Sequence, residues 1–584
     1  MRIGMNLIPL RPGHMGGAEV YFRDLLAELL KRGGHQYVLV TADYNHDTLP
    51  GDSPACRRIL FLREAHAAGR PRRWLARALA TLRRGVNRVR AHYGIHVPEG
   101  VRDLLRPLVL IAIRVARRFS RVMARLTGRR GRRHAEGLRE LIRREAIDLW
   151  FCPFTNLEPR VSPVPGVITV YDLQHEYFPE FFDPNELRHR RHFYPESCAG
   201  ADHIIAISEF TRRCVMERYG VAPEHVSAIS LAAGSDFAWR DAPARSKEVR
   251  RRHGLPARYV LYPANTWHHK NHVRLIEALA HYRRKEGEAL TLVLTGVSKE
   301  GQPGLMAAME DHGLTGLVRV LGFVPRADLP ALYAGAACLV LPSLFEGFGI
   351  PLVEAMLVGC PIAAADVASI PEVAGDAAVL FDPLDPVDIA RAIAAILRDP
   401  DRAAELARRG RARAELFSAS RMAERTVELF ERVHREGLVS GRGAGREQIA
   451  VDGVWDDQWM GHEAVVALRG RALVSLEIEG ELVAIGPLLP QRLVARVGGH
   501  EAAALSLPAP GPFSLTVPLL PDGGATGAWE ISLVSERTFR PQDFGPAPDP
   551  RDLSVRLLRL RVRTHDGREI VKTLGSAPEP RSAT

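Results

Sequence analysis

Two glutamates with seven residues between them, Glu346 and Glu354, flank a stretch of glycine, phenylalanine and proline. A carboxylate repels a phosphate group, but it accepts strong hydrogen bonds from hydroxyl groups. The pair therefore indicates a site for a ligand with several hydroxyls, such as a sugar or a ribose. The competing interpretation is a glycine-rich connector that carries two solvated glutamates.

The residues between these glutamates predict a phosphate site. The apolar run that ends at Pro342 is typical of a buried strand, and Pro351 favours the first turn of a helix. The main-chain N–H groups of Phe348, Gly349 and Ile350 would then be free at the positive end of the helix dipole. Because such a helix start binds diphosphates, the segment combines groups for phosphate with groups for hydroxyls.

A second polar loop follows a strand predicted at 258–262. It contains Asn265 and Lys270, and Asn271 is placed to cap the helix predicted at 272–284. An ammonium group near that helix start can neutralise a leaving diphosphate without a metal ion. The alternative is a lysine in an ordinary surface loop. The segment from Glu346 to Glu354 favours the functional interpretation.

The N-terminal part of the chain offers weaker candidates. Gly16 and Gly17 open the helix predicted at 18–31, and adjacent glycines let the backbone approach a ligand closely. Asp172 and His175 follow another predicted strand, at the edge of the sheet where ligands bind. A glycine pair is usually only a turn, and a lone histidine is more often structural.

The elements that must position these residues alternate between short apolar strands and helices of medium length. This order is typical of βαβ units around a parallel sheet. It occurs twice in succession, which suggests two doubly wound domains that face one another. The predicted strands lie at 2–8, 37–41, 147–152, 167–171, 203–207 and 226–230 in the first half, and at 258–262, 290–295, 318–321 and 338–342 in the second.

After residue 437 the chain changes to Val- and Leu-rich runs broken by Gly and Pro, which favours an antiparallel β-sandwich. We predict an α/β protein with two facing Rossmann-like domains and a C-terminal all-β sandwich. Its parts are an N-terminal domain at 1–240 with an Arg-rich helical insertion at about 57–135, a second Rossmann-like domain at 241–436 whose last helix packs back on the first, a linker at 437–446, the sandwich at 447–575 and a disordered tail at 576–584. The predicted strands of the sandwich are 472–478, 481–485, 492–497, 513–519, 529–534 and 553–562.

These motifs resemble those of the retaining glycosyltransferases of family 4, which have the GT-B fold. Glu346 and Glu354 match the family's Glu-x7-Glu motif, and the resemblance covers residues 1–436, most strongly 258–395. It implies that Glu346 contacts the transferred sugar near the reacting centre and that Glu354 binds the ribose of the nucleotide. The resulting site assigns catalysis to Glu346, Lys270 and Asp172, donor binding to Glu354, Phe348, Gly349, Ile350, Asn265, Gly16 and Gly17, and acceptor binding to His175.

Two positions depart from the family pattern. Tyr171 stands where the family commonly has a histidine near the sugar, and Asn265 stands where an arginine often lies. His175 is the candidate for the missing imidazole. Three nearby side chains could replace the missing phosphate contact: His268, His269 and Arg274.

The resemblance implies a front-face substitution in which the leaving phosphate helps to deprotonate the acceptor hydroxyl. We expect transfer of a hexose, by preference mannose from GDP-mannose, to a glycan or lipid-linked glycan acceptor during synthesis of a cell-surface polysaccharide such as lipopolysaccharide. No metal or other cofactor is expected, because no Asp-x-Asp motif follows a predicted strand. The alternatives are a glycan-binding protein with a degenerate transferase core and a GT-B sugar-nucleotide epimerase.

The net charge of +11 is concentrated in one segment. Residues 57–133 contain 22 Arg, no Lys and three acids, a net +19, which leaves the rest of the chain at −8. Apolar residues recur there at helical spacing, which suits an amphipathic helix on an anionic membrane surface. A solvated Arg face is the alternative, and nucleic acid is not expected because aromatic residues for stacking are nearly absent.

The compartment is inferred from two further features of the sequence. No apolar run is long enough to span a membrane, and the six cysteines form no CxxC pair. We therefore expect a cytoplasmic protein, peripheral on the inner face of the plasma membrane.

Overall fold

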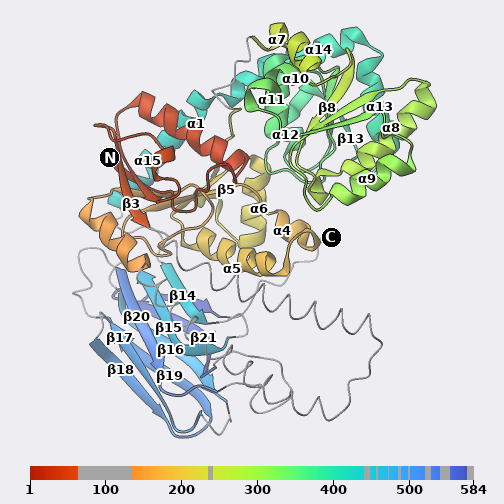
Figure 1. The fold of residues 1–584 in the computed structure, drawn as a ribbon. Helices are drawn as coiled ribbons and strands as arrows, with labels where there is room; N and C mark the ends of the chain where they lie inside the picture. Colours follow the sequence, from red (N-terminus) through yellow and green to blue (C-terminus); the bar gives the residue numbers. More distant parts are fainter. Residues whose placement is uncertain are drawn as a thin grey trace, which may run out of the picture.

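The computed structural model describes residues 1–62, 134–233, 241–439, 448–454, 458–470, 473–483, 488–497, 500–519, 528–539 and 553–574. Figure 1 shows two α/β domains next to one another and a β domain against the first of them. The predicted fold class is confirmed, because two parallel sheets with helices are followed by two antiparallel sheets.

The first domain is built on a seven-stranded parallel sheet with the order β3-β2-β1-β4-β5-β6-β7. Its central strands are apolar and buried, as a parallel sheet covered by helices on both faces requires. The strands are β1 (Arg2–Asn6), β2 (Gln36–Ala42), β3 (Cys56–Leu62), β4 (Leu149–Cys152), β5 (Gly166–Val170), β6 (His203–Ala206) and β7 (Val226–Ala228). The helices include α1 (Gly17–Arg32), α4 (Gln174–Tyr177), α5 (Pro184–Gly200) and α6 (Glu209–Tyr219).

The second domain repeats this design with a six-stranded parallel sheet in the order β10-β9-β8-β11-β12-β13. The strands are β8 (Tyr259–Pro263), β9 (Thr291–Thr295), β10 (Val318–Gly322), β11 (Cys338–Leu341), β12 (Ile362–Ala365) and β13 (Ala378–Phe381). The helices are α7 (Ala242–Arg252), α8 (His272–Glu286), α9 (Gln302–Asp311), α10 (Leu329–Gly335), α11 (Ile350–Val358), α12 (Ile370–Ala374), α13 (Pro386–Leu397) and α14 (Pro400–Ala414).

Each sheet reverses its strand order at one point, between β1 and β4 in the first domain and between β8 and β11 in the second. In doubly wound sheets, the loops beyond the carboxyl ends of the strands at such a point form the crevice that binds ligands. The loops after β1, β8 and β11 carry the glycine, lysine and glutamate motifs of the sequence. The topology therefore gathers these motifs at the place where a ligand is expected.

The last helix of the α/β region, α15 (Ala419–Val439), returns to the first domain. The ring of Phe430 packs on Phe151 of β4 with a centroid distance of 5.1 Å. On the surface, Glu424 pairs with Arg32 at the end of α1, at 3.4 Å. The second domain is thus tied to the first through a helix as well as through the chain connection.

The C-terminal region forms two antiparallel sheets, with the orders β14-β15-β20-β17-β18 and β19-β16-β21-β22. Apolar side chains of both sheets, such as Val466 and Leu476, are fully buried in one shared core, which makes the region a sandwich. The strands are β14 (Gln448–Val454), β15 (Met460–Arg469), β16 (Leu473–Leu482), β17 (Gln491–Val497), β18 (His500–Leu507), β19 (Gly511–Pro518), β20 (Ala528–Ser535), β21 (Arg556–Thr564) and β22 (Glu569–Thr573).

A buried ion pair fixes the sandwich to the first domain. Arg469, at the end of β15, donates hydrogen bonds to both carboxylate oxygens of Asp202, and only 1% of its surface is exposed. Its guanidinium also donates to the carbonyl oxygens of Ser162 and Val164, at 2.9 and 3.0 Å. The two terminal nitrogen atoms of Arg469 are thus matched by the carboxylate of Asp202 and two carbonyl oxygens, whereas its buried Nε has no hydrogen-bond partner.

The structure corrects several details of the sequence prediction. The strands predicted at 472–478 and 481–485 are one strand, β16. The predicted start of the Arg-rich insertion at 57 is wrong, because β3 occupies the first residues of that segment as an edge strand of the sheet. Seven strands were missed: β3, β12, β13, β14, β15, β18 and β22.

Some predictions fall on parts of the chain without a structural description. Residues 63–133, most of the linker and the tail at 576–584 lie outside the described residues, so the proposed amphipathic helix has no structural counterpart here. Within the described ranges, no helix is both long enough and apolar enough to cross a bilayer.

Candidate active site

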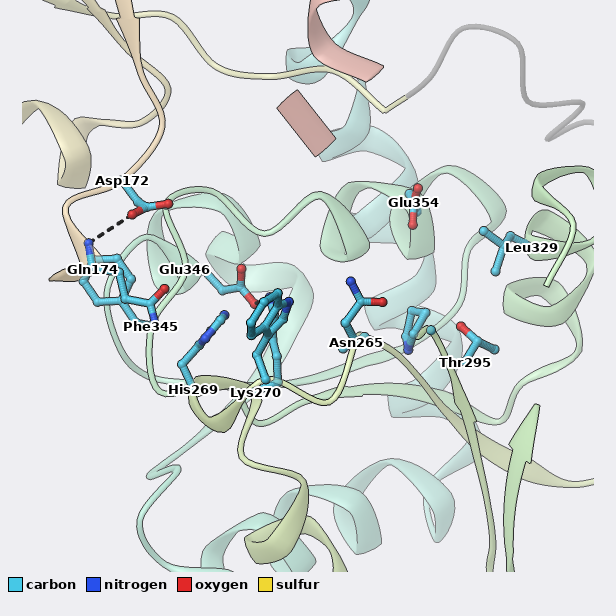
Figure 2. Close-up of a pocket in the computed structure, with 15 residues that line it drawn as sticks. Asp172, Gln174, Asn265, His269, Lys270, Thr295, Leu329, Phe345, Glu346 and Glu354 are labelled. Atoms are coloured by element: carbon cyan, nitrogen blue, oxygen red, sulfur yellow. Dashed lines mark hydrogen bonds and ion pairs between the residues drawn. The ribbon is translucent and has the colours of Figure 1, made fainter. Parts of the chain in front are cut away.

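A cavity of about 470 Å³ opens at the carboxyl ends of the strands, and both α/β domains contribute to its wall. Figure 2 shows it extending from Asp172 and Gln174 of the first domain to Thr295 and Leu329 of the second. Five predicted site residues line this cavity: Asp172, Asn265, Lys270, Glu346 and Glu354. The others in the wall are Gln174, Pro263, Ala264, Trp267, His269, Thr295, Gly296, Leu329, Phe345 and Gly347.

Glu346 and Lys270 form an ion pair in the middle of the cavity. The ammonium nitrogen of Lys270 donates to Oε1 of Glu346 at 2.6 Å. Burial raises the pKa of Glu346, but the charge of Lys270, a smaller electrostatic contribution from His269 and the hydrogen bonds from Lys270 and Ser343 together outweigh it, so this pKa lies below its usual value. The hydroxyl of Ser369 also donates to the main-chain carbonyl oxygen of Glu346 at 2.8 Å. The site therefore pairs the carboxylate of Glu346 with the ammonium group of Lys270.

Glu354 occupies a separate position, on the second turn of α11. Its carboxylate accepts a hydrogen bond of 2.6 Å from the hydroxyl of Tyr333, which lies on α10. Burial raises the pKa of Glu354, and the bond from Tyr333 works against that rise. With one oxygen held by the tyrosine, the other remains available to a hydroxyl donor in the cavity.

His269 lines the cavity, and its pKa differs strongly from that of a surface histidine. Burial and, to a smaller extent, the charge of Lys270 lower the pKa of His269 to about 3, so the imidazole is neutral at physiological pH. The imidazole cannot supply the cationic phosphate contact for which His269 was one of three candidates. It can still donate or accept one hydrogen bond at each ring nitrogen.

The structure corrects the prediction that Asn271 caps α8. Asn271 adopts a left-handed conformation with φ of 58°, and its side chain makes no capping hydrogen bond. Its amide nitrogen donates instead to the carbonyl oxygens of Pro342 and Pro383, at 2.9 and 2.8 Å. Asn271 thus ties the loop that carries Lys270 to the ends of β11 and β13.

The starts of α1 and α11 approach each other across the domain boundary, but the cavity wall includes none of the predicted donor residues Gly16, Gly17, Phe348, Gly349 and Ile350. Gly349 precedes α11 with φ of 95°, and no side chain caps this helix. Pro351 has no N–H group and the amide of Leu352 donates to the carbonyl oxygen of Gly349 at 2.9 Å, so the amides of Gly349 and Ile350 are the ones left for a ligand. Across the domain boundary, a Cβ atom on Gly17 would lie 3.1 Å from Cδ1 of Ile350, and Gly16 has φ of 54°. The predicted donor residues at the starts of α1 and α11 are therefore neighbours.

Phe348 contributes only its main chain to this arrangement. Its side chain is 2% exposed and packs against Phe417 with a centroid distance of 5.6 Å. The prediction of a donor contact through the amide of Phe348 is compatible with this placement, whereas a contact through its ring is not.

The first domain places Asp172 at the cavity. Its carboxylate accepts a hydrogen bond of 3.0 Å from the main-chain nitrogen of Gln174, and Arg190 lies 3.9 Å away. The neighbouring Tyr171 does not replace the missing histidine, because its hydroxyl donates to the carbonyl oxygen of Pro153 at 2.7 Å.

His175 is buried in the first domain and does not line the cavity. Its Nε2 lies 3.1 Å from the hydroxyl of Tyr219, and its ring packs edge-on against Tyr194. An acceptor would have to displace these neighbours to reach it, so the geometry corrects the prediction of an acceptor contact at His175. The buried imidazole is part of the core beneath α4.

Sequence reasoning missed several residues of the wall. Thr295 and Gly296 end β9, and Leu329 starts α10, so their positions at strand ends and helix starts were the available signal. Trp267 is a further missed residue: 36% of it is exposed, and Lys299 Nζ lies 4.8 Å from its ring centroid. Among the described residues, no group of three or more His, Cys, Asp or Glu could hold a metal ion.

Comparison with known proteins gives two family matches. The model described as Glycosyltransferase Family 4 matches residues 95–232, and the model described as Glycosyl transferases group 1 matches residues 246–413. The O-antigen chain mannosyltransferase B of Escherichia coli is 31% identical over 267 residues, which are 46% of this chain and 70% of that protein.

Two further matches are a protein much longer than the aligned region and a solved structure with low sequence identity. A serotype-specific mannosyltransferase WbdA of Escherichia coli is 33% identical over 257 residues, which are 43% of this chain but 31% of that protein. The structure of sucrose-phosphate synthase from Thermosynechococcus elongatus covers 75% of this chain and 100% of its own, with a TM-score of 0.52 and 19% identity. At that identity the likeness concerns the fold alone.

Proposed function

This chain belongs to glycosyltransferase family 4, and we propose that it transfers mannose from GDP-mannose to a glycan or lipid-linked glycan during synthesis of a cell-surface polysaccharide. One observation carries the proposal: the ion pair of Glu346 and Lys270 lies in a cavity whose wall also contains Glu354 of α11. The preference for mannose is supported by the names of the relatives that are 31% and 33% identical.

The groups of the cavity suit the parts of a nucleotide-diphosphate sugar. The N–H groups at the starts of α11 and α1 and the ammonium of Lys270 are the donors for the diphosphate oxygens. Glu354, on α11, accepts from a ribose hydroxyl. Glu346 accepts from hydroxyls of the sugar, and Asp172 faces it from the first domain, where the acceptor would enter.

The proposed reaction proceeds on one face of the sugar. The oxygen of the acceptor hydroxyl forms a bond to the anomeric carbon, while the bond from that carbon to the diphosphate oxygen breaks with its electron pair. The acceptor proton passes to the leaving phosphate oxygen. The protein lowers the barrier by holding both substrates in place and by neutralising the charge that develops on the diphosphate, which is the part of Lys270 and of the helix starts.

When the donor binds, the ammonium group of Lys270 has to contact the diphosphate as well as the carboxylate of Glu346. A flexible ammonium with three N–H donors can contact both at once. In the absence of donor, the carboxylate of Glu346 therefore holds the ammonium group of Lys270 in the position where it can bind a phosphate.

A donor screen tests this function. We expect mannosylated product and free GDP from GDP-mannose, with much slower turnover of UDP-glucose and UDP-galactose. Glu346→Gln should lower the rate of transfer by about 10³-fold, as loss of a group that acts in the transition state does. Glu310→Gln on the exposed surface of α9 is the matched control and should retain full activity. Equal release of GDP by the wild type and by Glu346→Gln would overturn the role of Glu346.

The location of the protein remains a proposal of its own. The net +19 charge of residues 57–133 supports docking on an anionic membrane surface, where a lipid-linked acceptor would be found. Co-sedimentation with vesicles that contain one third anionic lipid should capture the protein at low salt. Equal binding to neutral vesicles would contradict an electrostatic docking.

A further inference from the structure

Helix α6 of the first domain is capped by a carboxylate from the second domain. The main-chain nitrogen atoms of Glu209 and Phe210 donate to the two oxygens of Glu372, at 2.8 and 2.9 Å. The N-cap residue Ser208 satisfies only the next free amide, that of Thr211, at 3.0 Å. The first turn of α6 thus depends on both domains for its hydrogen bonds.

The same helix start holds the loop that carries Glu346. The hydroxyl of Ser208 donates to the carbonyl oxygen of Gly347 at 2.7 Å, and the hydroxyl of Thr211 donates to it at 3.2 Å. Gly347 also passes so close to the first domain that a Cβ atom would clash with the carbonyl oxygen of Tyr171. Only a glycine permits this approach.

These contacts make a reciprocal clasp across the cleft. The first domain holds the Gly347 carbonyl of the second domain, and Glu372 of the second domain holds the α6 amides of the first. Glu372 is itself held in place, since the guanidinium of Arg413 donates to the carbonyl oxygens of Glu372 and Val373 at 2.6 and 2.7 Å.

The clasp acts on the main chain directly beside the predicted catalytic carboxylate. Ser369 of the second domain holds the carbonyl oxygen of Glu346, and the next carbonyl along the chain is the one held by Ser208. When the domains separate, Ser369 can keep its contact, whereas the contact of Ser208 is lost. The orientation of the peptide between Gly347 and Phe348, one residue beyond Glu346, is therefore set only in the closed arrangement.

We propose that Ser208 and Glu372 are positioning residues that couple closure of the two domains to the placement of Glu346. The proposal rests on the proposed function, since it concerns the same site. Neither residue lines the cavity, so neither is expected to contact the donor. Their effect would be exerted through the loop of Gly347 and through the population of the closed state.

Kinetics separate a positioning role from donor binding. Ser208→Ala and Glu372→Ala should each lower kcat by roughly 10- to 100-fold, the loss expected for hydrogen bonds to a charged or buried partner. The affinity for GDP, measured by titration calorimetry, should change less than about 3-fold, because the nucleotide is bound mainly by the second domain. Ser208→Thr and Glu372→Gln keep an oxygen at the same place and should restore part of kcat.

Asp376→Asn is the matched control for Glu372. This carboxylate lies four residues further on, is exposed, and pairs with Arg409 of its own domain at 3.4 Å. It should leave kcat and closure unchanged. Thermal unfolding of each variant distinguishes a loss of positioning from a loss of fold, and a variant that unfolds early is replaced by its conservative partner.

Small-angle scattering gives a readout that does not depend on the identity of the sugar. With saturating GDP, the wild type and Glu346→Gln should share one radius of gyration, and Ser208→Ala and Glu372→Ala should have a larger one. Unchanged kcat and an unchanged radius in folded Ser208→Ala and Glu372→Ala would overturn the clasp. If instead no nucleotide sugar is turned over by the wild type while the radii differ as predicted, the proposed function fails and the clasp stands.

Discussion

The two α/β domains share one topology but present different chemistry to the cleft. The second domain supplies charged side chains, with Lys270, Glu346 and Glu354 in the cavity wall. The first domain supplies Asp172 and Gln174 to that wall, and outside the wall it contributes the start of α1 and the hydroxyl of Ser208. Under the proposed function this difference would be a division of labour, in which one domain binds the reacting groups and the other sets their position.

The largest effect is expected from removing the cation of the second domain. Lys270→Met should lower kcat by about 10²- to 10³-fold, because the ammonium that balances the leaving diphosphate is lost. Steady-state kinetics with GDP-mannose measures this effect. If the same loss followed from Lys299→Met, whose ammonium stacks on Trp267, then no special role would belong to Lys270.

A somewhat smaller effect is expected where the two domains touch. Gly347→Ala should lower kcat by about 100-fold, since the added methyl group clashes with the carbonyl oxygen of Tyr171 and shifts the catalytic loop. Gly304→Ala on α9 has room for its methyl group and serves as the control. Full activity of Gly347→Ala would show that close domain contact is not required for transfer.

The pH dependence distinguishes the two glutamates. Burial raises the pKa of Glu354, whereas the pKa of Glu346 is held down by Lys270 despite its burial. As the pH falls from neutral, Glu354 is protonated first, so KM for the donor should rise before kcat declines. In Lys270→Met the remaining burial raises the pKa of Glu346, and the decline of kcat should begin at a higher pH than in the wild type.

Rate profiles between pH 4.5 and 8 for both proteins would measure this order. A fall of kcat that precedes the rise of KM in the wild type would contradict the assignment. So would an identical decline of kcat in the two proteins.

The smallest effect on catalysis is expected at the sandwich. Arg469→Leu should destabilise the protein by about 3–5 kcal/mol, because it leaves the buried carboxylate of Asp202 without a partner. At a temperature where the variant is folded, kcat should stay within about 2-fold of the wild type, because none of the sandwich residues that the structure describes lines the cavity. A large loss of kcat in folded Arg469→Leu would give the sandwich a part in the reaction.

The charged half of the site could be predicted from the sequence because each part lies in one continuous segment. Glu346, the free amides and Glu354 follow one strand and open one helix, and Lys270 lies in the loop after another. Their meeting follows from the strand order of a doubly wound sheet. The sequence alone was therefore enough to predict that Glu346, Glu354 and Lys270 meet at the carboxyl ends of the strands.

The positioning half could not be predicted, because it consists of contacts between distant segments. Nothing near Glu372 in the sequence indicates that its carboxylate accepts from the amides of α6, 162 and 163 residues away. The predicted acceptor contact at His175 was wrong for the same reason, since the burial of this residue depends on Tyr194 and Tyr219, which lie on other helices.

The missed strands have local causes. β12 has the sequence Ile-Ala-Ala-Ala, and alanine has low β propensity, so only its place between β11 and β13 makes it a strand. β3 begins with Cys-Arg-Arg and lies at the edge of its sheet, where polar side chains are tolerated. In both, tertiary context decided the structure.

A crystal structure with bound GDP-mannose tests the central claim most directly. We predict that the diphosphate lies within hydrogen-bonding distance of Lys270 Nζ and of the amides of Gly349 and Ile350, with hydroxyls of the sugar on the carboxylate of Glu346. A donor bound elsewhere on the protein, or a cavity that stays empty at saturating donor, would contradict the account.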